Sequence, residues 1–142
     1  MTHSLHDITN NVYVGEFYPT LKQVRFWFAV YNQLIFHGKI TRFRYIIVKY
    51  YPNQLAHCHG KWDAKKDLRY CNLQLHPRFK SFTTFIAILV HEMIHAHQWV
   101  NEGRDMSHGP NFFRWKNKLE CNGLSLSIKY NNTKLKKIDI LI

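Results

Sequence analysis

The segment His91-Glu92-Met93-Ile94-His95 constrains the fold and the chemistry of this chain more than any other feature. On an α-helix, residues four apart lie on one face, about 6 Å apart along the axis, so two imidazoles at this spacing can bind one metal ion. Glu92 is adjacent to the first imidazole and can reach a water molecule on the metal without being a ligand itself. This H-E-x-x-H order is typical of zinc hydrolases, and it predicts a Zn²⁺ site.

The residues around the motif predict a helix of about 18–20 residues. Apolar side chains recur at steps of three and four from Phe82 to Ala96, and Ser81 is a suitable N-cap. Gly103 ends the pattern. Two histidines and a glutamate are costly to bury in such a helix as ordinary core residues, because their polar groups would lack partners. A metal site is therefore favoured over a packing role.

A catalytic zinc site needs a third protein ligand, and the candidates lie downstream of the motif. His108 is favoured, because it ends a polar loop that can fold back and a Gly-Pro turn follows it. Glu120 is the main alternative, since some zinc hydrolases take a glutamate from a following helix. His97 should face away, about 200° around the helix from the second motif histidine. The acids Glu102 and Asp105 are less favoured.

The other patterns predict an α+β fold in a single domain, residues 20–142, after a loosely ordered lead-in, residues 1–19. Thr20 can cap a helix with an apolar face from Leu21 to Ile35. Further expected elements are strands at 42–51, 54–62 and 69–76, a polar turn at 61–67, a helix from Pro110 and a hairpin formed by 124–130 and 134–142. We expect a sheet of three or more mainly antiparallel strands, packed on the central motif helix, with N-terminal and C-terminal helices.

The formal net charge of +11 predicts attraction to polyanions, with nucleic acid foremost. Basic residues are spread along the chain, which suits non-specific contact with phosphates of single-stranded or duplex DNA. Trp62 lies among one basic group and can stack on an unpaired base or simply pack. The candidate nucleic-acid-binding residues are Lys61, Trp62, Lys65, Lys66 and Arg69.

The cysteines and the absence of export signals predict an intracellular protein, in the cytoplasm or the nucleus. Cys58, Cys71 and Cys121 are far apart in the sequence and include no C-x-x-C pair, which excludes a Cys₄ zinc site and favours reduced thiols. No signal peptide and no stretch of 18 apolar residues is evident, so no membrane partner is expected. We expect a monomer.

Two motifs together carry a resemblance to a known family. The segment His91-Glu92-Met93-Ile94-His95-Ala96, followed by His108-Gly109-Pro110-Asn111-Phe112, closely resembles the SprT-like domain of the Spartan metalloproteases. Residues 28–40 look like the first helix of that domain and its exit, and residues 56–58 and 70–75 look like its sheet strands. The resemblance covers residues 20–130.

The resemblance implies a zincin-like metalloprotease domain that cleaves proteins bound or crosslinked to DNA. It implies that His91, His95 and His108 are zinc ligands and that Glu92 is the general base. The Cys-rich zinc ribbon of longer members is missing from this sequence, so DNA binding is expected from the domain's own basic and aromatic surface. The alternative function is a DNA-binding module whose zinc is mainly structural and which has little or no proteolytic activity.

Overall fold

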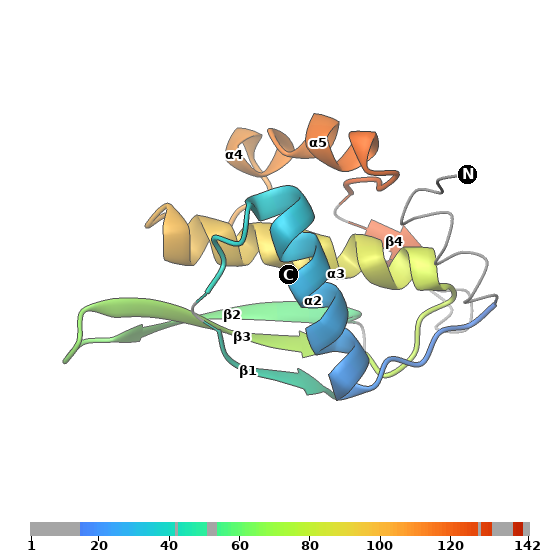
Figure 1. Cartoon of the computed structure of the whole chain (residues 1–142), viewed down its shortest axis with the longest axis horizontal. Helices are drawn as coiled ribbons and strands as arrows, with labels where there is room; N and C mark the ends of the chain where they lie inside the picture. Colours follow the sequence, from blue (N-terminus) through green and yellow to red (C-terminus); the bar gives the residue numbers. More distant parts are fainter. Residues whose placement is uncertain (1–14, 42, 51–53, 128, 132–137, 141–142) are drawn as a thin grey trace.

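A computed structural model describes residues 15–41, 43–50, 54–127, 129–131 and 138–140. The described part of the chain has α and β layers around one central helix, α3 (Phe82–Ala96). A three-stranded sheet lies on one side of α3, two short C-terminal helices lie on the other, and α2 (Leu21–Phe36) crosses α3 (Figure 1). The predicted α+β class with helices at both ends is thus observed.

The sheet is mixed, whereas mainly antiparallel pairing was predicted. Strand β2 (Ala56–Asp63) and strand β3 (Leu68–Leu75) form an antiparallel hairpin, but β1 (Phe43–Val48) pairs with β3 in parallel. The strand order is β1-β3-β2, so the chain crosses from one edge of the sheet to the other after β1. Alternation of side chains indicates which residues share a face, but it does not encode strand order or direction.

Both long helices begin at the predicted caps. The Thr20 hydroxyl accepts a hydrogen bond from the Gln23 N–H at 3.2 Å, and the Gln23 side chain accepts one from the Thr20 N–H at 2.9 Å. This capping box starts α2, which ends at His37 in the left-handed region with φ of 54°. At the start of α3, the Ser81 hydroxyl accepts from the Thr84 N–H at 3.0 Å.

The motif helix continues directly into a π-helical turn, η1 (His97–Asn101), which the sequence analysis did not predict. Together, α3 and η1 cover the helical span that the sequence predicted. The Glu102 N–H donates to the His97 carbonyl at 3.0 Å, five residues back, and thereby closes the wide turn. This turn determines the direction of the loop that carries His108.

The single helix predicted after Pro110 is two short helices, α4 (Pro110–Phe113) and α5 (Lys116–Cys121). The predicted C-terminal hairpin is present in shorter form, as β4 (Lys129–Asn131) paired antiparallel with β5 (Ile138–Ile140). Residues 124–127 are not part of a strand, and most of the predicted turn lies outside the described residues. In the β2–β3 hairpin, β2 extends through Lys61 and Trp62, so the polar turn is shorter than predicted.

The last residues of the predicted lead-in are packed rather than loosely ordered, while residues 1–14 lie outside the described part. Phe17 is buried, with its ring 5.0 Å from that of Phe82 and 4.9 Å from that of Phe85. Its backbone forms two hydrogen bonds with Phe79, and Glu16 forms an ion pair with Arg78 at 2.9 Å. Burial of the aromatic ring explains why this segment is held in place.

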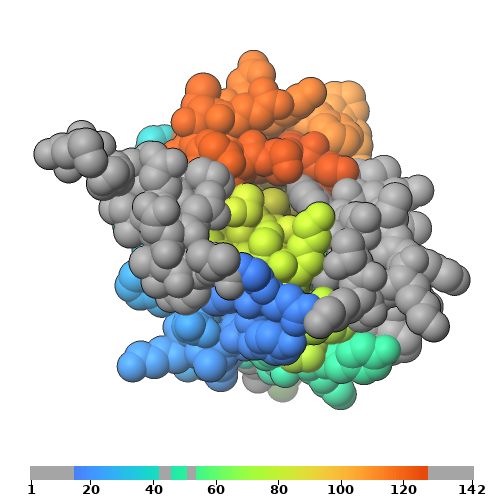
Figure 2. All heavy atoms as spheres, turned by 90° about the vertical axis from the view of Figure 1, so that its right-hand side faces the viewer, coloured from blue at the N-terminus to red at the C-terminus, as the bar shows by residue number. Residues whose placement is uncertain are grey.

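The core is centred on α3, whose side chains are all buried from Phe85 to Ala96. Figure 2 looks onto the N-terminal end of this helix, between the start of α2 below and the C-terminal segment above. A pocket of about 330 Å³ lies at this end, lined in part by Thr83, Glu120 and Ser125. No helix in the described ranges is long and apolar enough to cross a membrane.

Candidate metal centre

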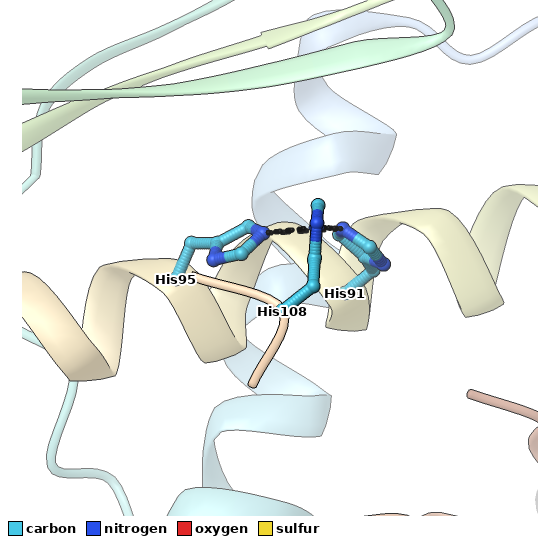
Figure 3. A group of neighbouring side chains, drawn as sticks. All are labelled: His91, His95 and His108. Atoms are coloured by element: carbon cyan, nitrogen blue, oxygen red, sulfur yellow. Dashed lines mark hydrogen bonds between the residues drawn. The ribbon is translucent and has the colours of Figure 1, made fainter. Parts of the chain in front are cut away.

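Three imidazoles from two segments converge beside the central helix α3 (Figure 3). His91 and His95 project from adjacent turns of α3, and His108 comes from the loop before α4. The Nε2 atom of His95 lies 3.2 Å from that of His91 and 3.0 Å from that of His108, and the third separation is 3.2 Å. Within the described residues, this is the one group of three or more His, Cys, Asp or Glu side chains suited to hold a metal ion.

The hydrogen bonds of the other ring nitrogens determine the tautomers of the two motif histidines. The His91 Nδ1–H donates to the Ser127 carbonyl at 2.8 Å, and the His95 Nδ1–H donates to the Gln98 side-chain oxygen at 2.9 Å. A neutral imidazole has one N–H, so both Nε2 atoms carry lone pairs. The 3.2 Å approach of these two Nε2 atoms is therefore repulsive unless a cation lies between them.

The electrostatics of the site favour neutral, metal-competent rings. Burial, with a further contribution from the neighbouring imidazoles, lowers the pKa of His91 to about 2. Burial is also the main cause that lowers the pKa of His95 to about 4, and it lowers the pKa of His108. Three nitrogens bound tetrahedrally to zinc at about 2.0–2.1 Å lie about 3.3 Å apart, close to the separations observed here. The three residues thus fit a Zn²⁺ ion in both chemistry and spacing.

Glu92 lies beside this centre, and its carboxylate is unusual because it is buried away from solvent. Its side chain is fully buried, neither carboxylate oxygen has a well-formed hydrogen bond within the described residues, and Oε2 lies 3.8 Å from the His91 Nε2. Burial raises the pKa of this carboxyl well above its ordinary value, while the backbone of Cys58 on β2 opposes the shift. A buried acid with so little hydrogen bonding costs stability, so its presence next to the imidazoles points to chemistry at the site.

Phe112 on α4 forms an aromatic support that contacts all three imidazoles. Its ring centroid lies 4.7 Å from that of His91, 5.1 Å from that of His95 and 5.0 Å from that of His108. The His95 ring is stacked on it at an interplanar angle of 17°. Because Phe112 is fully buried, it fixes the planes of the three rings by packing.

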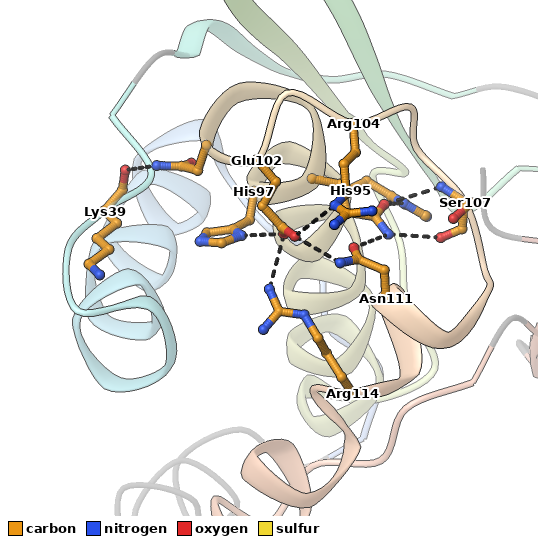
Figure 4. Close-up of polar contacts among 10 residues, drawn as sticks. Lys39, His95, His97, Glu102, Arg104, Ser107, Asn111 and Arg114 are labelled. Atoms are coloured by element: carbon orange, nitrogen blue, oxygen red, sulfur yellow. Dashed lines mark hydrogen bonds and ion pairs between the residues drawn. The ribbon is translucent and has the colours of Figure 1, made fainter.

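Gln98 connects the motif helix to the loop that carries His108. Figure 4 labels its partners His95, Ser107 and Asn111. Its buried side-chain oxygen accepts hydrogen bonds from His95 and from the Ser107 N–H at 3.2 Å. Its side-chain nitrogen donates to the Ser107 carbonyl at 3.2 Å and to the Asn111 side-chain oxygen at 3.1 Å. One amide therefore orients a candidate ligand and holds the residue next to another candidate ligand.

A second polar cluster anchors the same loop around Glu102 (Figure 4). Its carboxylate accepts a hydrogen bond from Asn111 at 2.8 Å and contacts His97 Nδ1 at 2.7 Å and Arg114 at 3.2 Å. Although burial acts in the opposite direction, hydrogen bonds from Asn111 and His97 lower the pKa of Glu102. His97 thus faces away from the metal centre, as predicted, and Glu102 has a structural role.

The remaining alternatives for the third ligand lie elsewhere. Glu120 lines the pocket at the N-terminal end of α3 and is within 4.0 Å of the Lys116 ammonium group. Asp105 is exposed in the loop between η1 and α4. Neither belongs to the group of metal-competent side chains, whereas His108 does.

The candidate nucleic-acid-binding residues lie on the β2–β3 hairpin. Lys61, Lys65 and Lys66 are exposed, and Trp62 is 59% exposed. Arg69 is half-buried instead, because its guanidinium stacks 4.1 Å from the centre of the Trp99 ring on η1. The hairpin extends beyond the body of the molecule (Figure 1), so four of the five residues present their side chains to solvent.

Comparison with protein-family models matches residues 24–134 to the SprT-like family. The match covers most of the chain, and the chain therefore belongs to the SprT-like family. A comparison with curated proteins found no match.

Sequence reasoning did not identify three contributors to the site: Gln98, Phe112 as a support for the imidazoles, and the Ser127 carbonyl. Gln98 has a local signal, because it follows His95 by three residues on a helix and so shares its face. Phe112 follows His108 by four residues, but His108 precedes α4, so helical spacing does not predict their contact. A backbone carbonyl has no signature in the sequence.

Proposed function

We propose that this chain is a zinc-dependent endopeptidase of the SprT-like type, with a zincin-like domain, that acts on proteins bound or crosslinked to DNA. Membership of the SprT-like family supports a metallopeptidase-like activity. The observation that carries the proposal is the convergence of three imidazole Nε2 atoms beside the fully buried carboxylate of Glu92.

In this mechanism His91, His95 and His108 would hold the zinc ion. Bound zinc supplies Lewis-acid chemistry, since it polarises a carbonyl group and makes water acidic near neutral pH. Glu92 accepts a proton from the attacking water at a carboxylate oxygen and delivers it to the leaving amine. Its burial excludes competing solvent, and its position 3.8 Å from the His91 Nε2 leaves it outside the ligand set.

The polypeptide substrate would bind in extended form along β2. This strand is at the edge of the sheet order and packs against α3, and the backbone of Cys58 on β2 lies next to Glu92. An extended segment that adds to such an edge gains backbone hydrogen bonds with little dependence on its sequence. This mode of binding suits an enzyme with many protein substrates.

DNA is the proposed platform that concentrates those substrates. The net charge of +11 and the exposed lysines of the β2–β3 hairpin favour non-specific binding of phosphates. We further propose an intracellular site of action, because the thiols of Cys58 and Cys71 are buried next to each other without a disulfide bond. The expectation of a monomer stays a prediction.

The test compares wild type with Glu92→Gln and with the matched control Glu120→Gln. Each protein is assayed for zinc per chain and is incubated with a basic DNA-binding protein, with and without single-stranded DNA. We expect wild type and Glu120→Gln to produce fragments, more with DNA present, and Glu92→Gln to retain zinc without cleavage. Cleavage by Glu92→Gln at the wild-type rate would refute the mechanism.

The same assay distinguishes the proposed protease from the alternative function, a DNA-binding module with structural zinc. The charge of +11 motivates this alternative. It predicts salt-sensitive DNA binding that is equal in wild type and Glu92→Gln, together with no fragments from either protein under any condition.

A further inference from the structure

A second group of histidines, which shares no residue with the metal centre, lies on the sheet, and its member His57 is near enough to His95 to lower the pKa of that ring. His57 and His59 are two residues apart on β2, so their side chains project from the same face of the strand. The centroids of their rings are 4.9 Å apart, the same separation as between His91 and His95. Neither ring is hydrogen-bonded within the described part of the chain. Two imidazoles at this spacing on a strand can bind one ion together.

The neighbouring strand adds an oxygen atom to this group. Asn72 on β3 pairs directly with His59, and Gln74 pairs with His57, so all four side chains share one face. Asn72 is only 8% exposed, yet its side-chain oxygen is buried without a hydrogen-bond partner among the residues that the structure describes. A buried carbonyl oxygen without a partner is destabilising, and a ligand that supplies a partner removes this cost.

The side chains surround a small cavity rather than a flat surface. It has a volume of about 40 Å³ and is lined by Ile47, His57, His59, Asn72, Leu73 and Gln74. This volume suits one ion or one or two water molecules and is too small for an organic ligand. Burial and the neighbouring His59 lower the pKa of His57, which favours the neutral ring that metals require.

We propose that His57, His59 and Asn72 form a second metal site on the sheet, distinct from the centre on α3 and specific for a transition metal ion such as Zn²⁺, Ni²⁺ or Cu²⁺. Imidazole nitrogen is a good ligand for these ions, whereas Mg²⁺ and Ca²⁺ prefer sites made of oxygen atoms. An amide oxygen is a weaker ligand than a third imidazole. The second site therefore binds its ion more weakly than the centre formed by His91, His95 and His108.

The test measures Zn²⁺ and Ni²⁺ binding to the metal-free chain by calorimetric titration. We expect two ions per chain for wild type and one for the double variant His57→Asn/His59→Asn, which keeps the tighter ion. The control His37→Asn removes an exposed histidine at the left-handed C-cap of α2, where asparagine also fits, and should still bind two. A single ion in wild type, or a second ion that persists in the His57/His59 variant, would overturn the proposal.

Substitutions of Asn72 test its role as a ligand. One of them is expected to raise the affinity for metal, which a folding defect would not do. Asn72→Asp replaces the amide with a carboxylate, a stronger ligand, and should tighten the weaker site by about tenfold while leaving the tighter site unchanged. Asn72→Leu, of similar size, should weaken the second site. If Asn72→Asp leaves the affinity of the second site unchanged, Asn72 is not a ligand and the proposed site is wrong.

Discussion

The two imidazoles of the motif helix each use their two nitrogen atoms differently, and this division makes the residues specific to their positions. For His91 and His95, Nδ1 donates to an oxygen of the protein and Nε2 is left as a lone pair. The orientation of His95 depends on Gln98, whose amide has four hydrogen-bond partners. Gln98 is therefore a positioning residue for the candidate ligands.

Replacing Gln98 with leucine should weaken zinc binding by about 10- to 100-fold, because His95 loses its acceptor and the His108 loop loses its anchor. Gln98→Glu keeps an acceptor for His95 and should retain most of the affinity. The measurement is competition for zinc with a chelator of known affinity. Gln33→Leu, at an exposed position on α2, is the control and should bind as wild type does. Equal affinities for Gln98→Leu and Gln33→Leu would contradict this role.

Phe112 and Phe113 offer a matched pair on the same helix. Phe112 is fully buried under the imidazoles and Phe113 is 39% exposed. We expect Phe112→Ala to lower the free energy of unfolding by about 3–5 kcal/mol, because it leaves a cavity under the site. Phe113→Ala should change it by about 1 kcal/mol or less. Denaturant titration of the metal-free proteins measures both, and similar losses would show that Phe112 does not support the core.

At the scale of elements, α3 is the unit that joins fold and site. It contributes two candidate ligands and Glu92, and it packs against the sheet, α2 and the C-terminal segment. Its N-terminus depends on Ser81, whose hydroxyl accepts from the Thr84 N–H. His91, Glu92 and His95 all lie on this helix, so the residue at which α3 begins influences where the site is placed.

Removing this cap should have a measurable cost. We expect Ser81→Ala to destabilise the protein by about 1 kcal/mol, since the first turn of α3 loses the acceptor for one of its free N–H groups. Ser81→Asp preserves an acceptor and should stay close to wild type. Thermal unfolding of the three proteins gives the comparison. A loss in Ser81→Asp equal to that in Ser81→Ala would mean that the hydroxyl does not act as a cap.

The sequence predicted those elements whose signals are local. The caps at Thr20 and Ser81, the apolar spacing of α2 and α3, and the approximate positions of the strands were all readable from neighbouring residues. The parallel pairing of β1 with β3 was not, because strand direction depends on the path of the chain between strands. The break between α4 and α5 and the π-helical turn η1 were also not predicted, since neither contains a proline or glycine at the point of change.

The same distinction holds for the site. The spacing of His91 and His95 is a local helical signal, so their shared face followed from the motif alone. Whether His108 or Glu120 lies near the motif histidines depends on the path of the loop after η1. Gln98 and Glu102 hold that loop through hydrogen bonds to residues 9 to 13 positions further along the chain. The sequence favoured His108 among the candidate third ligands, but it could not show where each candidate lies in the fold.

For the whole molecule, charge is the property most open to test. Three lysines of the β2–β3 hairpin, Lys61, Lys65 and Lys66, are exposed on an element that extends from the body of the fold. Replacing all three with alanine should weaken binding of single-stranded DNA and reduce the slope of log K against log salt by about 2, since each phosphate contact contributes about 0.7. Fluorescence anisotropy over a series of salt concentrations measures this slope.

The control removes the same charge from other exposed positions, Lys22, Lys80 and Lys116. If the hairpin is the DNA-binding surface, this control should leave the slope near the wild-type value. Equal changes in both triple variants would mean that DNA responds to net charge alone and that the hairpin has no particular role.

The most direct test of the central claim is anomalous diffraction at the zinc absorption edge from crystals of the zinc-loaded protein. We expect a zinc peak with the Nε2 atoms of His91, His95 and His108 as ligands at about 2.0–2.1 Å, and with Glu92 outside the coordination sphere. Zinc bound without any one of these three imidazoles, or no zinc peak between α3 and the His108 loop, would contradict it.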